Sequence, residues 1–105
     1  MDGHTEAIWV KMRDDPTPEE VRQAMLDFDP GLVELPTSPK KALIVKDEPD
    51  RPQPRLDRMR GNGMSISVGR IRSGIRFICI GHNTVRGAAG ASILNAELLV
   101  KKGLL

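Results

Sequence analysis

Hydrophobic and polar residues alternate along three stretches of the chain, which is the pattern of β-strands. These stretches are residues 5–13, 65–72 and 75–81, and a period of two residues predicts strands. Residues 5–13 carry apolar side chains on both faces, which predicts a mostly buried strand. Ser73-Gly74 separates the other two and predicts an antiparallel hairpin. A short apolar run at 42–46 predicts a fourth strand.

Residues 17–28 follow the pattern of an amphipathic helix. Thr17 suits the N-cap and Pro18 the first helical position, while Glu20 completes a capping box with Thr17. The sequence Asp29-Pro30-Gly31 ends the helix. The apolar side chains form a single stripe, made by Val21, Ala24, Met25 and Phe28. One stripe predicts a helix on the surface of the domain.

The C-terminal segment predicts a second helix, which begins at the small residues 87–90 and is apolar nearly all round. Its apolar side chains are Ala88, Ala89, Ala91, Ile93, Leu94, Ala96, Leu98, Leu99 and Val100. A helix of this kind must be covered on more than one side. A chain of 105 residues offers little to cover it. We therefore expect residues 86–99 to pack against a part that this chain does not contain.

These elements predict an α+β fold. We expect a mixed, mostly antiparallel sheet with one covering helix, and the apolar C-terminal helix outside it. A chain of 105 residues is expected to form one domain. Residues 47–64 contain three prolines and are predicted to be irregular. A loop of this length is usually functional or part of an interface.

Composition excludes several kinds of partner. The net charge of +2 and the aromatic content of 3% do not favour a nucleic-acid-binding protein. The single cysteine, Cys79, allows no intramolecular disulfide and favours a reducing compartment. No apolar run has the length of a membrane span, and residues 1–10 lack a signal-peptide pattern. We therefore expect a cytoplasmic protein without a membrane partner.

His4 and Cys79 are the first candidates for chemistry. A histidine at the mouth of a strand can act as a general acid or base near neutral pH, although spacing alone favours an ordinary exposed histidine. Neither residue has companions at metal-ligand spacing, so no metal site is expected. Cys79 lies inside an alternating strand, where cysteines usually pack inertly. His82 should face the opposite side of that strand, which argues against a Cys79–His82 nucleophile pair.

The small residues 87–90, at the start of the C-terminal helix, are the third candidate. They leave room for a ligand to approach the backbone. A close contact between helix and sheet would require small residues equally, and the sequence is not the Gly-x-Gly-x-x-Gly pattern of dinucleotide-binding folds.

Four segments taken together resemble the C-terminal part of the aspartate-β-semialdehyde dehydrogenases, in particular their archaeal and fungal branch. They are DGHTEAIWV (2–10), DEPDRPQPRLDR (47–58), GNGMSISVGRIR (61–72) and GHNTVRGAAGASILNAELL (81–99). The resemblance implies NADPH-dependent reduction of β-aspartyl phosphate to the semialdehyde with release of phosphate, a step in lysine, threonine and methionine biosynthesis. It also implies a homodimer or tetramer.

The resemblance also assigns roles to individual residues. His4 matches the family's acid–base histidine, and Asn83 matches the residue that holds the nicotinamide carboxamide. Thr84, Gly87 and Ala88 would line the cofactor pocket through their backbone. Without the resemblance, Asn83 reads almost equally well as a turn residue. The resemblance divides the chain into two parts: residues 1–82 end the catalytic and dimerisation domain, and residues 83–105 return to the nucleotide-binding domain.

The chain departs from the family in what it lacks. The nucleophilic cysteine, the Gly-rich phosphate loop and the substrate-binding arginine belong to segments absent here, and Cys79 does not match the nucleophile. We therefore expect a fragment that is inactive alone and shares NADP with a missing N-terminal portion. Two alternatives remain open: part of a paralogous malonyl-CoA or succinyl-CoA reductase, and a non-catalytic remnant that only dimerises.

Overall fold

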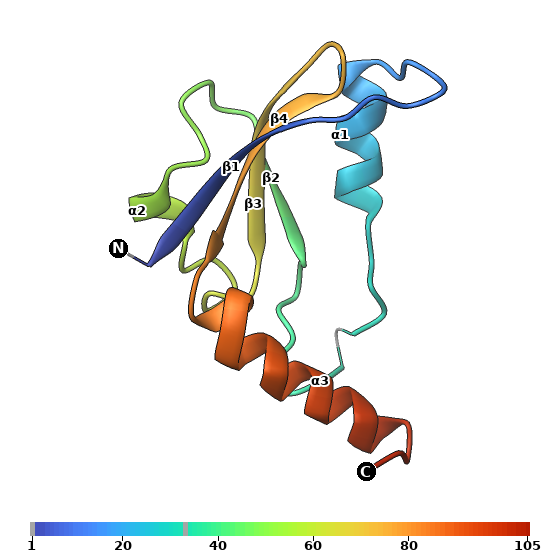
Figure 1. Ribbon diagram of the computed structural model, residues 1–105, viewed down its shortest axis with the longest axis vertical. Helices are drawn as coiled ribbons and strands as arrows, with labels where there is room; N and C mark the ends of the chain where they lie inside the picture. The colour runs from blue at the N-terminus through green and yellow to red at the C-terminus, as the bar shows by residue number, and fades with distance from the viewer. Residues whose placement is uncertain (1, 33) are drawn as a thin grey trace.

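A four-stranded sheet with the strand order β1-β4-β3-β2 organises the chain. The structure is a computed structural model that describes residues 2–32 and 34–105, and the counts below refer to these. Its elements, shown in Figure 1, are β1 (Gly3–Trp9), α1 (Pro18–Asp27), β2 (Leu43–Lys46), α2 (Pro54–Asp57), β3 (Ile66–Arg72), β4 (Arg76–His82), the π-helical turn η1 (Val85–Ala89) and α3 (Gly90–Lys101).

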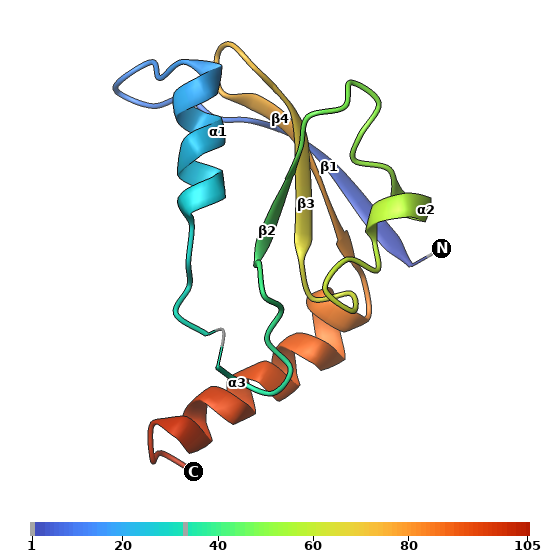
Figure 2. The same cartoon turned by 180° about the vertical axis from the view of Figure 1, so that it is seen from behind.

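The sheet is mixed and mostly antiparallel, as the sequence predicts. β4 pairs antiparallel with both β1 and β3, whereas β2 pairs parallel with β3. Helix α1 packs against β2 and β3, and the short helix α2 packs against β1 and β4. Helix α3 runs across the lower end of the sheet, away from both (Figures 1 and 2). The fold is therefore α+β, as predicted.

Helix α1 has the capping box expected from its sequence. The Thr17 hydroxyl accepts a hydrogen bond of 3.2 Å from the backbone N–H of Glu20, and the Glu20 carboxylate accepts one of 3.1 Å from the N–H of Thr17. Val21 and Met25 are half-buried, while Phe28, just beyond the helix, is 50% exposed. The helix thus lies on the surface and covers part of the sheet.

The stretch 47–64 is more ordered than its prolines predict, because it contains α2. Asp57, at the end of α2, is fully buried. Its carboxylate accepts hydrogen bonds from the Arg51 guanidinium, with 2.8 Å to Nε, and from the backbone N–H of Gln53 at 2.7 Å. Arg60 contributes Nε at 3.3 Å. This cluster ties the stretch into one compact unit beside the sheet.

Strand β1 differs from the buried strand predicted for residues 5–13. It ends at Trp9, most of its residues are exposed, and the Trp9 side chain is 78% exposed. The prediction of burial was wrong because β1 lies at the edge of the sheet, where it pairs with β4 on one side only. Within the described residues, α2 packs against part of β1, and only Gly3 and Ile8 of the strand are half-buried.

Helix α3 packs on its own chain along one side only. Leu94 is buried in a cluster with Leu35 and Met64, which Leu32, Val85 and Leu98 extend. On other sides of the helix, Ile93 is 51% and Val100 58% exposed. The predicted helix therefore exists, with η1 preceding it. Its packing against a further part of a larger protein stays a prediction.

Candidate functional site

The start of β1 and the end of β4 lie side by side at the lower end of the sheet. His4 faces Gly81 in the antiparallel ladder, and Gly3 faces His82. The backbone N–H of Asn83 donates a hydrogen bond of 2.6 Å to the carbonyl oxygen of Asp2. This pairing holds the segment that carries His4 against the turn that carries Asn83.

An open pocket of about 370 Å³ lies at this junction. It is lined by His4, Glu6, Ile66, Cys79, Gly81, His82, Asn83, Arg86 and Gly87. Three residues that the sequence predicts for the site, His4, Asn83 and Gly87, therefore meet in one pocket. Thr84 and Ala88 do not line it, although both are exposed in the adjoining turn and η1.

Glu6 and Arg86 line the pocket without having been predicted. The Glu6 carboxylate lies 3.3 Å from Nε2 of His4, and both side chains are largely exposed. Strand alternation puts residues i and i+2 on one face, so the sequence already contained the signal for a His4–Glu6 contact. Arg86 carries no comparable signal, because its place in the pocket depends on the turn between β4 and α3.

Cys79 is an inert thiol in this arrangement. Burial, and then the negative charge of Glu6, raise the pKa of the Cys79 thiol above its ordinary value. A raised pKa keeps the sulfur protonated, and the thiolate is the nucleophilic form. The sheet register puts Cys79 opposite Glu6 and His82 opposite Gly3, on alternate faces. The register thus separates Cys79 from His82, and the raised pKa disfavours the thiolate form of Cys79.

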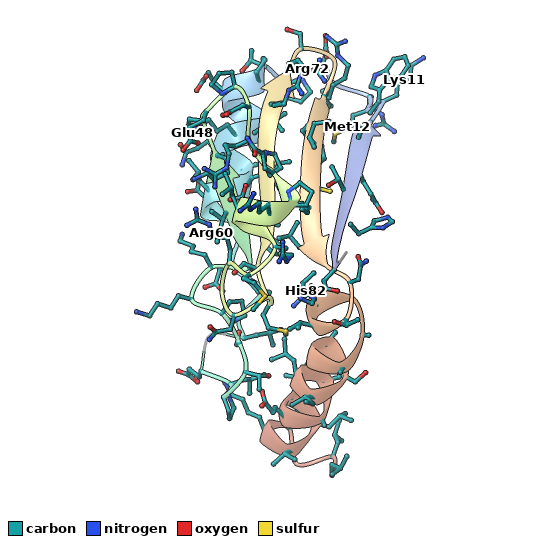
Figure 3. All side chains as sticks on the ribbon, turned by 90° about the vertical axis from the view of Figure 1, so that its left-hand side faces the viewer. Lys11, Met12, Glu48, Arg60, Arg72 and His82 are labelled. Carbon is teal, nitrogen blue, oxygen red and sulfur yellow. The ribbon has the colours of Figure 1, made fainter. Side chains whose placement is uncertain are left out.

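The turn after β4 is held by a buried histidine, His82, which is 7% exposed and lies where the sheet meets η1 (Figure 3). Its Nδ1 accepts hydrogen bonds from the backbone N–H groups of Thr84 and Val85. Asn83, between these residues, is exposed with its side chain at the pocket. The turn therefore presents one amide side chain from a fixed backbone.

The resemblance predicts that these residues hold the nicotinamide end of NADP. The Asn83 amide offers both a donor and an acceptor, which is what a carboxamide needs. At Gly87, an added Cβ would meet only the carbonyl oxygen of His82, at 3.4 Å, so the backbone there is open to a flat ring.

Among residues 2–32 and 34–105, no three His, Cys, Asp or Glu side chains gather as metal ligands do.

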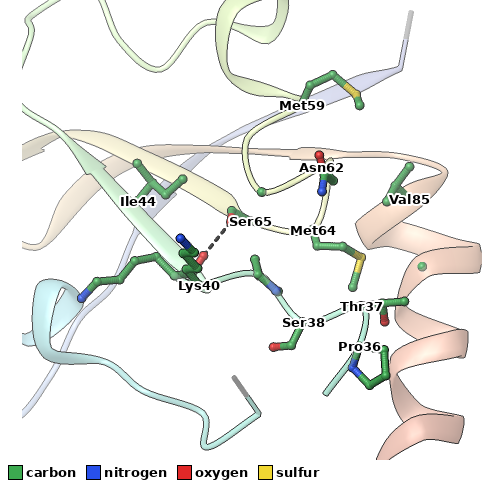
Figure 4. A pocket seen from close by; sticks show the side chains of 14 residues that line it. Pro36, Thr37, Ser38, Lys40, Ile44, Met59, Asn62, Met64, Ser65 and Val85 are labelled. Carbon is green, nitrogen blue, oxygen red and sulfur yellow. Dashed lines mark hydrogen bonds between the residues drawn. The ribbon is translucent and has the colours of Figure 1, made fainter. Parts of the chain in front are cut away.

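A larger cavity, of about 880 Å³, lies away from this site. It is bounded by residues 36–41, by the loop around Asn62 and by Val85 and Gly90 (Figure 4). The Ser65 hydroxyl donates a hydrogen bond of 2.6 Å to the carbonyl oxygen of Lys41 in its wall. Of the candidates from the sequence only Gly90, at the end of the small residues 87–90, lines this cavity. His4, Asn83 and Gly87 line the smaller pocket instead.

The family model of the semialdehyde dehydrogenase dimerisation domain matches residues 1–86 of this chain. The chain belongs to this family. The resemblance drawn from the four sequence segments is thereby confirmed, while the division of the chain at residue 82 stays a prediction. In the part of the chain that the structure describes, no helix has the length and apolarity to cross a bilayer.

Named proteins similar to this member of the dimerisation-domain family include enzymes of two kinds. It is 58% identical over its whole length to an aspartate-semialdehyde dehydrogenase of Archaeoglobus fulgidus, of which it covers 31%. It is 44% identical, over 98% of its length, to a malonyl CoA reductase (NADP) of Metallosphaera sedula, of which it also covers 31%. The chain thus spans about a third of these relatives.

A solved structure supports the fold over the full chain. The aspartate-semialdehyde dehydrogenase of Candida albicans, crystallised with NADP, superposes with a TM-score of 0.84 at 41% identity. The superposition covers all of this chain and 32% of the Candida albicans protein. The α+β fold and the mixed sheet described above are therefore those of this dehydrogenase domain, α3 included in the aligned length.

Proposed function

We propose that residues 1–105 act as the C-terminal part of an NADP-dependent aspartate-semialdehyde dehydrogenase. The reaction is the reduction of β-aspartyl phosphate to aspartate semialdehyde with release of phosphate, a step toward lysine, threonine and methionine. The observation that carries the proposal is the 58% identity over the whole chain to the Archaeoglobus fulgidus enzyme. The pocket that unites His4 with Asn83 supports it.

His4 is the acid–base group of the proposed reaction. Its imidazole lies in the open pocket, where it can take a proton from a reacting group and return it near neutral pH. Glu6, 3.3 Å from Nε2 of His4, orients the ring. The nucleophile comes from outside these 105 residues, because Cys79 is neither activated nor paired with a base.

Asn83 would hold the carboxamide of NADP in the same pocket. When bound there, NADPH would supply the hydride that reduces the substrate. Gly87 borders the nicotinamide in that pocket, and the backbones of Thr84 and Ala88, exposed in the adjoining turn and η1, would extend that border. The remainder of the cofactor requires a nucleotide-binding portion. Residues 83–105 dock on that portion through the exposed side of α3, where Ile93 and Val100 lie.

The sheet of residues 1–82 is the part of the proposed enzyme that assembles into a homodimer or tetramer. The family description as a dimerisation domain supports this assembly. The edge strand β1 and the exposed apolar side chains beside α1 leave ample surface for it. Among these side chains are Met12, 59% exposed, and Phe28, 50% exposed.

A chimera tests the proposal directly. Residues 1–105 replace the matching third of the Archaeoglobus fulgidus enzyme, and phosphate-dependent oxidation of aspartate semialdehyde is followed through NADPH absorbance. We expect turnover within about tenfold of the parent enzyme, since the replaced part is similar throughout, and none from the 105-residue chain alone. A folded chimera without turnover would refute the proposal.

The malonyl-CoA reductase alternative rests on the 44% identity to the Metallosphaera sedula protein. A second chimera, built into that protein, distinguishes the two functions when both are assayed with malonyl-CoA and with aspartate semialdehyde. Activity of the second chimera alone would favour the acyl-CoA reaction. A chain that dimerises but is inactive in both chimeras would favour the non-catalytic remnant.

A further inference from the structure

His82 is a buried polar side chain to which neither the family match nor the proposed chemistry gives a role. It ends β4 and faces Gly3 across the ladder, and it is only 7% exposed. A buried imidazole is retained in a protein interior when its ring nitrogens meet hydrogen-bond partners. The partners of His82 therefore indicate what it does.

The Nδ1 atom of His82 receives two backbone donors. The N–H of Val85 donates at 3.1 Å and the N–H of Thr84 at 3.3 Å, and the Thr84 hydroxyl lies 3.3 Å away. Because amide N–H groups only donate, Nδ1 must be unprotonated, and the ring proton of neutral His82 lies on Nε2. The structure therefore selects one tautomer.

This contact acts as a side-chain cap at the start of the helical segment formed by η1 and α3, although His82 lies two residues before the N-cap residue Thr84. Side chains of Ser, Thr, Asp and Asn cap helices by accepting from N–H groups two or three residues ahead, and the His82 ring accepts from residues two and three ahead. Thr84, at the N-cap position of η1, makes no capping hydrogen bond with its own side chain. His82 supplies that cap instead.

The cap also fixes the residue between its two ends. Asn83 follows His82 directly and precedes Thr84, and its own N–H is bonded to the carbonyl oxygen of Asp2 at 2.6 Å. The backbone on both sides of Asn83 is thus tied down, once to the segment preceding His4 and once to the His82 ring. A loss of the ring acceptor frees two N–H groups and loosens the turn.

We propose that His82, as its Nε2-protonated tautomer, is a positioning residue for the nicotinamide of NADP. It acts through Asn83 and touches no substrate, and the proposal rests on the function proposed above. On this proposal, His82 fixes the position of Asn83 by capping the turn and makes no direct contact with the cofactor. An acceptor at position 82, and not an imidazole as such, is what the turn requires.

Two variants of the Archaeoglobus chimera distinguish the role of the hydrogen-bond acceptor at position 82 from that of the size of its side chain. His82→Phe keeps a ring of similar size and removes the acceptor, whereas His82→Asn keeps an acceptor that can reach the same N–H groups. We expect His82→Phe to raise the KM for NADP about tenfold, the effect of losing a cap and misplacing one amide. The KM for aspartate semialdehyde stays within about twofold, and His82→Asn recovers most of the NADP affinity.

Nitrogen NMR of the 105-residue chain gives a readout that does not depend on activity. The chain has only two histidines, so a His4→Asn variant assigns the signals of His82. We expect the shifts of an unprotonated Nδ1 and a protonated Nε2. A protonated Nδ1, an unchanged KM for NADP in His82→Phe, or an Asn variant as impaired as the Phe variant would each overturn the inference. An inactive unmodified chimera counts instead against the proposed function, and the tautomer still tests the cap.

Discussion

Asp2 and Asn83 are joined by a backbone hydrogen bond of 2.6 Å, from the N–H of Asn83 to the carbonyl oxygen of Asp2. The bond continues the β1–β4 ladder by one step beyond Gly3 and His82. As a result, the residue matched to acid–base chemistry and the residue matched to cofactor binding lie at the hydrogen-bonded ends of two paired strands. Their separation is set by sheet geometry, which varies little, rather than by a flexible loop.

Removal of the His4 imidazole tests the proposed chemistry. In the chimera with the Archaeoglobus enzyme, we expect His4→Ala to lower kcat roughly 10²–10⁴-fold, as loss of a general acid–base group does. Thr5→Ala, one residue along the same exposed strand but on its other face, is the matched control and should retain kcat within about twofold. Equal kcat values for the two variants would remove His4 from the mechanism.

The buried Asp57 predicts an acid-dependent loss of stability. Hydrogen bonds from Arg51, against the opposing effect of burial, and from the N–H of Gln53 lower the pKa of the Asp57 carboxyl from 3.8 to about 2. Because the folded-state pKa is depressed, its stabilisation is present above the unfolded value and is lost as pH falls through about 2.

Asp57→Asn should therefore cost roughly 2–4 kcal/mol at pH 7, and this deficit should shrink between about pH 4 and pH 2. Thermal unfolding at several pH values measures it. Asp15→Asn, at an exposed carboxylate, serves as the control with little effect at any pH. A deficit that does not change with pH would show that the charge of Asp57 contributes nothing.

Gly69 in β3 is predicted to tolerate no side chain. A Cβ there would collide with the carbonyl oxygen of Arg51 and lie 3.0 Å from Cδ of Pro52. Backbone atoms yield poorly, so Gly69→Ala should lower stability by about 1–3 kcal/mol. Gly87→Ala, whose Cβ would lie 3.4 Å from the carbonyl oxygen of His82, should be nearly neutral in a urea titration. If the Gly69→Ala and Gly87→Ala variants were equally stable, the segment that carries Arg51 would have to lie farther from β3 than described.

Two neighbouring residues of α3 distinguish its covered side from its uncovered side. Leu94 is 4% exposed and Ile93 51%. In the isolated chain, Leu94→Ala should cost roughly 2–4 kcal/mol, the range for buried leucines, and Ile93→Ala less than about 0.5 kcal/mol.

In the chimera, Ile93→Ala should become destabilising as well, because a nucleotide-binding portion would cover it. Denaturant unfolding of both variants in both contexts provides the measurement. An Ile93→Ala variant that is neutral in the chimera too would show that the outer side of α3 stays in solvent. It would thereby contradict the docking that the apolar sequence predicts.

The sequence predicted elements with strong local signals and missed those set by tertiary contacts. The capping box of Thr17 and the Ser73-Gly74 hairpin depend on residues a few positions apart, and both are present. Helix α2 was missed, since four residues among prolines carry no periodicity. Its formation depends on Asp57, whose carboxylate bonds to the N–H of Gln53 and to Arg51.

The candidate site divides in the same way. His4, Asn83 and Gly87 came from a family match, and the strand register brings them together. Glu6 was visible in principle, because a strand places it beside His4. Arg86 and the cap made by His82 were not, because both depend on the path of the chain between β4 and α3. The residues between β4 and α3 show no periodic pattern of apolar side chains from which the path of the chain could be predicted.

The edge position of β1 has a consequence for handling the chain alone. Along residues 3–9 every second peptide group points away from β4, and in the described structure these groups meet no other strand. Such a row is a template onto which a strand from another molecule can hydrogen-bond. Trp9, at the end of that row, adds a large apolar surface. Concentrated solutions of the free chain should therefore self-associate along β1, and a single lysine introduced there should keep them dispersed.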